Sequence, residues 1–276
     1  MILEMPQTKG LHRNSIDKYY TSEEVVIKCM KEIEKHLDIE AANDLCIEPS
    51  AGNGAFISRI DKLFNNALFY DIEPDHLEIK KQDFISLNID ISNFRKVHVL
   101  GNPPFGRQST LAIKFIKKAC EFADSVSFIL PKSFKKESMQ KHFPLNFYLI
   151  HECDIPFNSF IVDGKPHDVP CVFQIWEYRK EPRDPIEKLS PKGYKFVKQT
   201  ENPDLSFRRV GFKAGEISSD TENKSHQSHY FIKLEDDINE TKMKELKNIN
   251  FKSKDNTVGA RSISKQELIK EFNMIF

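Results

Sequence analysis

The segment Cys46-Ile47-Glu48-Pro49-Ser50-Ala51-Gly52-Asn53-Gly54-Ala55-Phe56 runs from apolar residues through a carboxylate and two glycines into a second apolar stretch. This order predicts a strand over 44–48, a tight turn, and a helix over 54–63. Gly52 and Gly54 allow the backbone to approach a ligand where a Cβ atom would collide. The amides at the start of a helix also favour an electron-rich group. The turn is therefore a candidate ligand site, although a Gly-x-Gly pair by itself also occurs in plain turns.

Outward from this segment, short apolar stretches alternate with amphipathic ones between residues 44 and 178. Strands are predicted over 44–48, 67–72, 97–101, 126–130, 147–153 and 171–178, with a weaker one over 79–84. Helices are predicted over 22–37, 54–63, 109–122 and 133–142, with Ser109 as an N-cap. Strands separated by helical stretches indicate an α/β fold with a parallel sheet. Such sheets bind ligands at the carboxyl ends of their strands.

The composition is that of a globular chain. It has 276 residues, 39% of them hydrophobic, and 22 are Phe. No apolar run approaches the roughly 20 residues of a membrane span, and no signal peptide is evident. A soluble, intracellular protein with no membrane partner is expected. The five cysteines are widely spaced without a Cys-x-x-Cys pair, so free thiols and no metal site are expected: Cys29, Cys46, Cys120, Cys153 and Cys171.

The texture of the chain changes near residue 180. Prolines punctuate 181–185 and 190–193, and Lys, Asn and Ser become frequent. We therefore expect one domain over 1–180 and a smaller region over 181–276. In the smaller region, strands are predicted over 194–197 and 230–234, and helices over 240–247 and 264–272. Ser264 and Glu267 form a predicted capping box.

Acidic residues end two further predicted strands. Asp71 follows Phe69-Tyr70, and a carboxylate there can accept hydrogen bonds from both hydroxyls of a ribose. Asp83-Phe84 ends the weaker strand, and this pair suits an adenine ring, with the acid accepting from its amino group and the aromatic ring covering its face. Each acid alone is an ordinary surface residue in most proteins. Together with Glu48 they make three acidic strand ends in sequence.

The motif that points to chemistry is Gly101-Asn102-Pro103-Pro104-Phe105-Gly106. Two prolines fix φ twice and remove two backbone donors, so the Asn102 side-chain oxygen and nearby carbonyls can face outward as a rigid acceptor pair. A planar exocyclic amine fits such a pair, which would aim the lone pair of its nitrogen. Phe105 offers a face on which a base can stack, worth about 1–3 kcal/mol.

These motifs resemble those of S-adenosylmethionine-dependent adenine-N6 methyltransferases. Asn-Pro-Pro-Phe at 102–105 resembles the catalytic signature of that family, and 48–56 resembles its methyl-donor loop. Asp-Lys-Tyr-Tyr-Thr-Ser at 17–22 is similar to the Tyr-Tyr-Thr-Pro segment that precedes the loop, with Ser22 in place of the usual proline. The resemblance covers residues 17–178. It implies a Rossmann-like class I methyltransferase fold: a mostly parallel seven-stranded sheet with helices on both faces, plus a small C-terminal target-recognition or accessory region.

The resemblance also implies the cofactor S-adenosylmethionine and a set of site residues. The cofactor-binding residues would be Tyr19, Tyr20, Thr21, Glu48, Pro49, Ser50, Gly52, Asn53, Gly54, Asp71, Ile72, Asp83, Phe84 and Asn102. The catalytic residues would be Asn102, Pro103, Pro104 and Phe105. The substrate-binding residues would be Phe105, Arg107, Lys132, Phe160, Arg208 and Arg209, with Phe157 as the other candidate for a second aromatic face.

Several functional interpretations remain open. The leading one is a DNA adenine-N6 methyltransferase that transfers the methyl group directly to a flipped-out or unpaired adenine. The second is an RNA adenine-N6 methyltransferase, and the third a catalytically silent cofactor-binding subunit. Pro170-Cys171 matches the Pro-Cys pair of cytosine-C5 methyltransferases, but the position of that nucleophile is occupied here by 102–105. No histidine has a readable Ser or Cys partner for hydrolase chemistry.

The net charge of zero excludes a generally sticky nucleic-acid binder. Lys and Arg number 41, as do Asp and Glu. A basic face around 102–105 is still expected, because acids in a cofactor pocket would balance it in the total. Its candidates are Arg107, Lys132, Lys135, Lys136, Lys141 and His142. In the C-terminal region, Phe207-Arg208-Arg209-Val210-Gly211-Phe212-Lys213 interleaves aromatic and basic residues, as readers of single strands do. A plain loop is the equal alternative for this segment.

Overall fold

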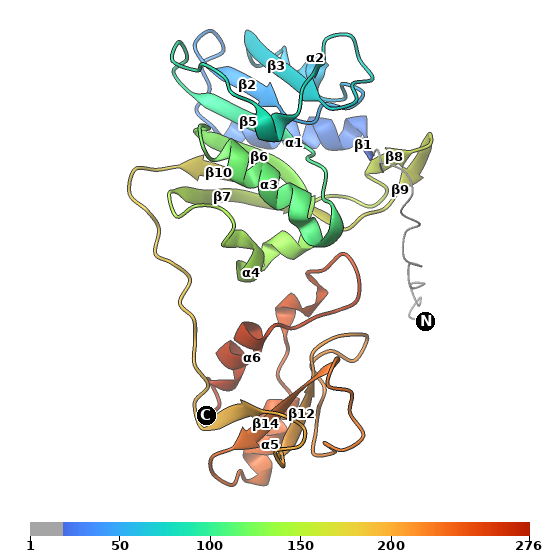
Figure 1. Cartoon of the computed structure of the whole chain (residues 1–276), viewed down its shortest axis with the longest axis vertical. Helices are drawn as coiled ribbons and strands as arrows, with labels where there is room; N and C mark the ends of the chain where they lie inside the picture. The colour runs from blue at the N-terminus through green and yellow to red at the C-terminus, as the bar shows by residue number, and fades with distance from the viewer. Residues whose placement is uncertain (1–18) are drawn as a thin grey trace. The chain divides into compact units, whose positions relative to one another are not determined.

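A computed structural model describes residues 19–276, which form two compact units (Figure 1). The first unit ends at Pro185, and the second is Ile186–Phe276. Asp17 and Lys18, which begin the Tyr-Tyr-Thr segment, lie outside the described residues. Across 19–276, no helix has the length and apolar character needed to cross a bilayer.

The first unit is built on a seven-stranded sheet. Its strands are β2 (Leu45–Glu48), β3 (Asn66–Asp71), β4 (Lys80–Lys81), β5 (Val97–Gly101), β6 (Ser125–Pro131), β7 (Phe147–Asp154) and β10 (Cys171–Tyr178). The order across the sheet is β4-β3-β2-β5-β6-β10-β7. The pairs from β4 to β6 are parallel, and β10 runs antiparallel to both neighbours. This mostly parallel α/β sheet has the class I methyltransferase topology, so the expected fold is confirmed.

Helices cover both faces of the sheet because alternate residues of each strand face opposite sides. In β5, Val97 and Val99 belong to one buried cluster and Leu100 to the other. The helices α1 (Glu23–His36) and α2 (Ile57–Ile60) pack into the cluster of Leu100. The helix α3 (Thr110–Ala119) packs into the opposite cluster, and α4 (Glu137–Gln140) joins the same side through Met139.

Several predicted elements are shorter than expected. The helix over 54–63 reduces to the four residues of α2, because Gly52 and Gly54 hold positive φ values and the turn extends to Phe56. The strand over 79–84 divides into β4 and a 3₁₀ turn, η1 (Phe84–Ser86). The helix over 133–142 divides into η3 (Lys132–Lys135) and α4.

The Ser109 cap is wrong in its mechanism. Ser109 precedes α3, but it is left-handed with φ of 61° and its side chain makes no capping hydrogen bond. Gln108, in the 3₁₀ turn η2 (Arg107–Ser109), is also left-handed, with φ of 53°. Two consecutive non-glycine residues in this region are strained, and such strain clusters at functional sites.

Five strands escape sequence analysis: three short ones in the first unit, and those over 205–208 and 217–218 in the second. A small antiparallel sheet joins β1 (Tyr20–Thr21), β8 (Phe160–Val162) and β9 (Lys165–His167). Tyr20 pairs with Ile161 and Thr21 with Phe160. Strands of two or three residues are too short to show an alternating pattern. The pairing of β1 with β8 also joins residues about 140 positions apart in the sequence. It fixes the Tyr-Tyr-Thr segment beside the sheet.

The second unit has its own sheet and core. The strands β11 (Tyr194–Val197), β12 (Leu205–Arg208), β13 (Ile217–Ser218) and β14 (His229–Leu234) form an antiparallel sheet in the order β11-β14-β12-β13. The helices α5 (Glu240–Lys247) and α6 (Lys265–Phe272) contribute Leu246, Leu268 and Phe272 to the core, and the turn η4 (Lys252–Asp255) lies between them. The predicted capping box is confirmed: Ser264 and Glu267 exchange both hydrogen bonds at the start of α6.

Candidate active site

Three neighbouring parallel strands bring the predicted motifs to one edge of the sheet. Asp71 ends β3, Glu48 ends β2, and Asn102 follows β5. Hydrogen bonds join their loops: the Gly52 amide donates to Asp71 Oδ2 at 2.8 Å, and Ser50 Oγ donates to the Asn102 carbonyl at 3.1 Å. Residues 19 and 52 positions apart in the sequence are therefore in direct contact at one site.

The loop between β2 and α2 needs glycine at two positions. Gly52 has φ of 52° and Gly54 has φ of 79°, a region that other residues rarely adopt. A Cβ atom at Gly52 would lie 3.1 Å from the Tyr20 ring, and one at Gly54 would lie 2.8 Å from Ile57 Cδ1. The two glycines thus allow the backbone to turn closely under the Tyr-Tyr-Thr segment and into α2.

The Tyr-Tyr-Thr segment is hydrogen-bonded to Asn102 and to Asp75 in the loop after β3. Asn102 Nδ2 donates to the Tyr19 carbonyl at 3.2 Å and to Thr21 Oγ1 at 3.3 Å. The Tyr20 hydroxyl donates to Asp75, a residue that sequence analysis did not single out. These contacts place residues 19–21 over the same edge of the sheet as Asp71 and Glu48.

One acceptor atom of the Asn102 side chain has no hydrogen-bond partner in the described structure. Its amide nitrogen makes the two bonds above, while Oδ1 is buried and has no hydrogen-bond partner in the described structure. A buried oxygen without a partner costs free energy until a donor reaches it, on the order of 1–3 kcal/mol. An amino group could donate a hydrogen bond to this oxygen and so satisfy it.

The residues after Asn102 form a rigid turn. Pro103 is buried and Pro104 is exposed. Phe105 is partly exposed, and its carbonyl accepts hydrogen bonds from the Leu111 and Ala112 amides, which fasten the turn to the start of α3. The strained Gln108 and Ser109 complete this connection. The turn therefore holds the Phe105 ring at the edge of the site.

Glu48 is an unusual acid for this position. Its side chain is buried beside Asp71, and its Oε2 atom has no hydrogen-bond partner in the described structure. Burial, reinforced by the negative charge of Asp71, raises the pKa of Glu48 to about 8. A Cβ atom on Gly101 would lie 3.1 Å from Glu48 Cγ, so the end of β5 closes over this carboxyl group. Such a group favours a cationic ligand, which would restore its ionised form.

The raised pKa gives a prediction about stability without cofactor. Between about pH 4.5, its ordinary value, and pH 8, folded Glu48 holds a proton that the unfolded chain has lost. The free energy of unfolding therefore falls as pH rises through this window, by up to about 1.4 kcal/mol per pH unit. Glu48→Gln removes this dependence, so the variant should gain stability relative to the wild type between pH 5 and 8.

Denaturant unfolding at pH 5, 6.5 and 8, followed by circular dichroism, measures this difference. Glu34→Gln is the matched control, because Glu34 is an exposed glutamate of α1 in the same unit. Equal pH slopes for wild type and Glu48→Gln would show that Glu48 is ionised in the folded protein.

Two expectations about aromatic residues need correction. The sequence predicts that Phe84 covers an adenine ring, but Phe84 is 1% exposed and packs against Phe115 and Phe122 in the core. Its neighbour Asp83 accepts a hydrogen bond from the Ile85 amide and caps η1. Since the ring of Phe84 has no open face, it cannot cover a base; it anchors the turn that follows Asp83 in the core.

The second aromatic face is also not Phe160. Its ring is 1% exposed and lies edge-on to Tyr19 at 6.3 Å between centroids. Phe157, the other candidate, is 73% exposed on the loop that leads into β8. The sequence of 157–162 could not show which ring faces inward, because the pairing of β8 with β1 decides it.

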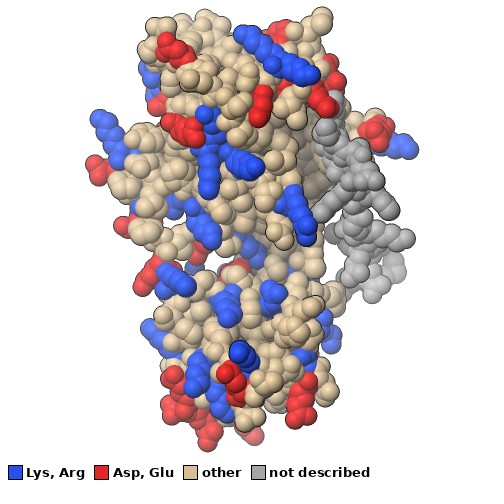
Figure 2. Space-filling model, viewed as in Figure 1, with Lys and Arg blue, Asp and Glu red and all other residues tan. Residues whose placement is uncertain are grey.

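The basic residues near the site differ in availability. Arg107 is exposed and Lys132 is partly exposed. Lys135 is neutralised by Asp154 at 3.0 Å and Glu152 at 3.7 Å, and Lys136 is almost buried. On the face shown in Figure 2, lysines and arginines are spread over both units with acidic side chains among them. Fewer basic side chains around 102–105 are therefore available than the sequence suggests.

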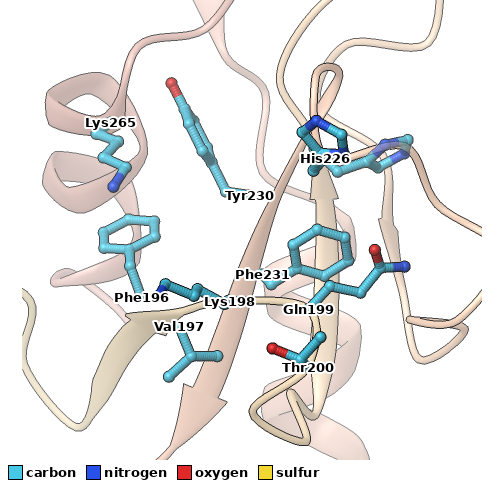
Figure 3. A pocket seen from close by; sticks show the side chains of 10 residues that line it. Phe196, Val197, Lys198, Gln199, Thr200, His226, Tyr230, Phe231 and Lys265 are labelled. Atoms are coloured by element: carbon cyan, nitrogen blue, oxygen red, sulfur yellow. The ribbon is translucent and has the colours of Figure 1, made fainter.

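The second unit contains an aromatic and basic cavity of about 470 Å³ (Figure 3). It is lined by Phe196, Val197, Lys198, Gln199, Thr200, His226, His229, Tyr230, Phe231 and Lys265. Lys265 Nζ lies 4.6 Å from the centre of the Phe196 ring and 5.7 Å from that of Tyr230. Sequence analysis missed this cavity because its rings and cations come from β11, β14, α6 and the loops beside the two strands, which the fold brings together.

The two arginines singled out in this unit lie in different surroundings. The Arg209 guanidinium lies 5.5 Å from the centre of the Tyr230 ring and donates to the Gln227 carbonyl at 2.8 Å. Arg208 donates from Nε to the Val210 carbonyl and lines a smaller polar hollow with Lys213 and Lys224. Arg209 thus shares an aromatic ring with the cavity, while Arg208 belongs to a neighbouring basic patch.

Comparison with known proteins gives structural likeness only. No protein-family model matches the sequence, and no curated protein is similar to it in sequence. Over 60% of its length, the chain is similar to a structure described as an RNA methyltransferase from Pyrococcus horikoshii, with a TM-score of 0.47, 16% identity and 90% of that chain covered.

Two further solved structures are similar over the same share of this chain. One is the 23S rRNA methyltransferase ErmE, with a TM-score of 0.44, 11% identity and 71% of that chain covered. The other is a type I restriction–modification methyltransferase subunit from Streptococcus thermophilus, with a TM-score of 0.45, 12% identity and 46% of that chain covered. Likeness of this degree assigns no activity to the chain.

Proposed function

We propose that this protein is an S-adenosylmethionine-dependent methyltransferase that acts on the exocyclic N6 amine of adenine in nucleic acid. The observation that carries the proposal is the buried, unpartnered Oδ1 of Asn102, set before two prolines at the same edge of the sheet as Asp71 and Glu48. An acceptor oxygen without a donor, placed beside a glycine loop and two acids, suits an amine substrate next to a bound cofactor.

The residues of the loop fit this cofactor. S-adenosylmethionine supplies a methyl group already activated on a sulfonium ion. Asp71 would accept hydrogen bonds from the ribose hydroxyls while it holds the Gly52 amide, and Gly52 and Gly54 leave room for close approach. Glu48, buried and without a partner at Oε2, would balance positive charge on the cofactor. Tyr19, Tyr20 and Thr21 would cover its methionine part.

Asn102 and the following turn would position the target base. Asn102 Oδ1 and a backbone carbonyl of the proline pair would accept the two amine protons, which draws the nitrogen lone pair out of conjugation and aims it at the methyl carbon. Phe105 would stack against one face of the base. Phe157, which is exposed, is the remaining candidate for the second aromatic face. Such catalysis depends on positioning, with the reacting atoms about 3–3.5 Å apart.

DNA is the proposed substrate, with RNA as the alternative. The methyl-donor loop and the Tyr-Tyr-Thr segment resemble those of DNA enzymes, whereas the small second unit also suits a single strand or a loop. A duplex target requires base flipping, which costs a few kcal/mol, and a single strand avoids that cost. In the second unit, the aromatic rings of the cavity suit base stacking, and the basic patch around Arg208 suits phosphate contacts.

Transfer from a radiolabelled methyl donor to four substrates in parallel tests this choice. The substrates are duplex DNA, single-stranded DNA, ribosomal RNA and capped messenger RNA, each with and without adenine. We expect label in adenine-containing DNA, above that in either RNA. Label in RNA alone would replace DNA by RNA as the substrate, and binding of the donor with no label in any substrate would favour the silent-subunit interpretation.

The second unit gives a separate prediction about affinity. The double substitution Arg208→Ala and Arg209→Ala should weaken nucleic-acid binding by about tenfold or more, because each arginine is placed to contact a phosphate or a stacked base. The salt dependence of log Kd should become shallower by about one for each phosphate group that the variant no longer binds. Fluorescence anisotropy with labelled oligonucleotides at several salt concentrations measures both effects.

Arg179→Ala is the matched control for this experiment. The Arg179 guanidinium also lies over a tyrosine ring, that of Tyr148 at 4.5 Å. Arg179 follows the end of β10, which pairs with the start of β6 and so lies away from the carboxyl ends of the parallel strands. Its loss should leave affinity unchanged. Equal affinities for the double variant and the wild type would return Arg208 and Arg209 to a structural role in their loop.

A further inference from the structure

A carboxylate and two histidines meet on the first unit, on the face of the sheet that α1 covers. Glu32 and His36 are four residues apart on α1, so their side chains lie on one side of the helix. His151 lies in β7, the edge strand of the seven-stranded sheet. The packing of α1 against β7 brings these three side chains together, and none of them has a part in the proposed methyl transfer.

The donor atoms of the three side chains lie close together. Glu32 Oε2 lies 3.2 Å from His151 Nε2 and 3.4 Å from His36 Nε2. The two imidazole rings are stacked, with centroids 4.3 Å apart and planes 21° apart. All three donor atoms are buried, although each side chain is about one-fifth to one-quarter exposed.

These close distances are not accompanied by hydrogen bonds. Within the described structure, Glu32 Oε2, His36 Nε2 and His151 Nε2 each lack a hydrogen-bond partner. Buried polar atoms are normally satisfied, and three unsatisfied atoms within 4.8 Å of one another form an exceptional group. The shortfall would be removed by one cation that accepts a lone pair from each atom.

We propose that Glu32, His36 and His151 bind a divalent transition-metal ion of the zinc class. Zinc lies about 2.0–2.2 Å from nitrogen and oxygen ligands in a tetrahedral arrangement, which separates neighbouring ligand atoms by about 3.3–3.5 Å. The separations of 3.2 and 3.4 Å around Glu32 Oε2 are close to that spacing. Two imidazoles with one carboxylate are a ligand set that zinc accepts, with a water molecule in the fourth position.

A metal at this site would link α1 to the edge strand β7. α1 begins two residues after Thr21, so a metal that joins α1 to β7 would also steady the approach to the Tyr-Tyr-Thr segment. The competing explanation is an ion pair between Glu32 and one protonated histidine. That explanation gives no response to metal, so the two are separated by experiment.

Metal binding by the full-length protein tests the proposal. After removal of metal with a chelator, equilibrium dialysis against Zn²⁺ and elemental analysis should give one zinc ion per chain. His36→Ala, His151→Ala and Glu32→Gln should each weaken this affinity by at least about tenfold, since even the loss of a group that only supports a ligand costs about 10- to 100-fold. Substituted Co²⁺ should show the intense visible absorption of a four-coordinate site.

The controls match each variant in residue type. His142→Ala removes a partly buried histidine of the same unit, and Glu34→Gln removes a glutamate of the same helix. Both should retain one zinc ion. Thermal unfolding covers variants that fold less well: Zn²⁺ should raise the Tm of the wild type and of the controls, and should leave the Tm of the three cluster variants unchanged.

Two results would overturn the proposal. One is a wild-type protein that binds no stoichiometric zinc and shows no metal-dependent Tm, which would leave an ion pair as the explanation. The other is zinc binding that survives all three cluster substitutions, which would place the ion elsewhere. Neither readout involves methyl transfer, so this test is independent of the proposed function.

Discussion

Asn102→Ala is expected to lower the rate of methyl transfer by at least about 100- to 1,000-fold, the cost of losing one preorganised polar group at a reacting centre. The reason is local. Oδ1 of Asn102 is the buried acceptor without a partner, and alanine leaves the target amine with no side-chain oxygen to orient it. Single-turnover rates with a saturating labelled donor measure the effect on the chemical step.

The same substitution should leave cofactor affinity within a few fold. Asn102 Nδ2 also holds the Tyr19 carbonyl and Thr21 Oγ1, so a small loss of affinity is expected from a looser segment. Thr21→Val is the matched control, because it removes the Thr21 bond and leaves Asn102 Oδ1 in place. Thr21→Val should keep most of its transfer rate. Activity that survives Asn102→Ala would show that Asn102 is not the catalytic acceptor.

Asp71→Ala is expected to raise the Kd for S-adenosylmethionine by about 10- to 100-fold or more. Hydrogen bonds to a charged carboxylate contribute about 1.5–3 kcal/mol each, and Asp71 would make them to the ribose. It also accepts from the Gly52 amide at 2.8 Å and from the Glu73 amide at 2.9 Å, so its loss loosens the glycine loop as well. Isothermal titration calorimetry with the cofactor and with its demethylated product measures this change.

Two further variants separate these contributions. Asp71→Asn keeps an oxygen that can hold the Gly52 amide, so it should bind better than Asp71→Ala and less well than the wild type. Asp90→Asn is the control, because Asp90 also accepts from a backbone amide, that of Ser92 at 3.0 Å, away from this loop. A Kd that Asp71→Ala does not change would remove Asp71 from the cofactor site.

The sequence predicts the parts of the fold whose signal is local. β5, β10 and β11 have the predicted bounds, because each is a continuous apolar or alternating run with a clear end. The same is true of α5, and the Ser264–Glu267 box starts α6 as expected. The mostly parallel sheet follows from the alternation of strands and helical stretches, whereas the order of the strands across it comes from the structure.

What the sequence misses depends on contacts between distant residues. The pairing of β1 with β8 joins residues about 140 positions apart, and it buries Phe160 while Phe157 stays exposed. Phe84 turns into the core because η1 follows Asp83 instead of an extended strand. Lys135 is neutralised by Asp154 only once β7 is in place.

Some features of the candidate site could also be expected from the sequence, and others could not. That Glu48, Asp71 and Asn102 meet could be expected, because parallel strands end at one edge of a sheet. The raised pKa of Glu48, the orphaned oxygen of Asn102 and the tie from Asn102 to Tyr19 needed the folded chain. The cluster of Glu32, His36 and His151 was beyond reach for the same reason, since β7 supplies its third member.

The central claim is most directly tested by identifying the methylated nucleoside. The protein is incubated with a deuterium-labelled methyl donor and the nucleic acid that takes up label, which is then digested to nucleosides and analysed by mass spectrometry against standards. We expect N6-methyladenine carrying one labelled methyl group, present with wild-type protein and absent with Asn102→Ala. A labelled methyl group on cytosine, on a ring nitrogen of adenine or on the sugar would contradict the claim.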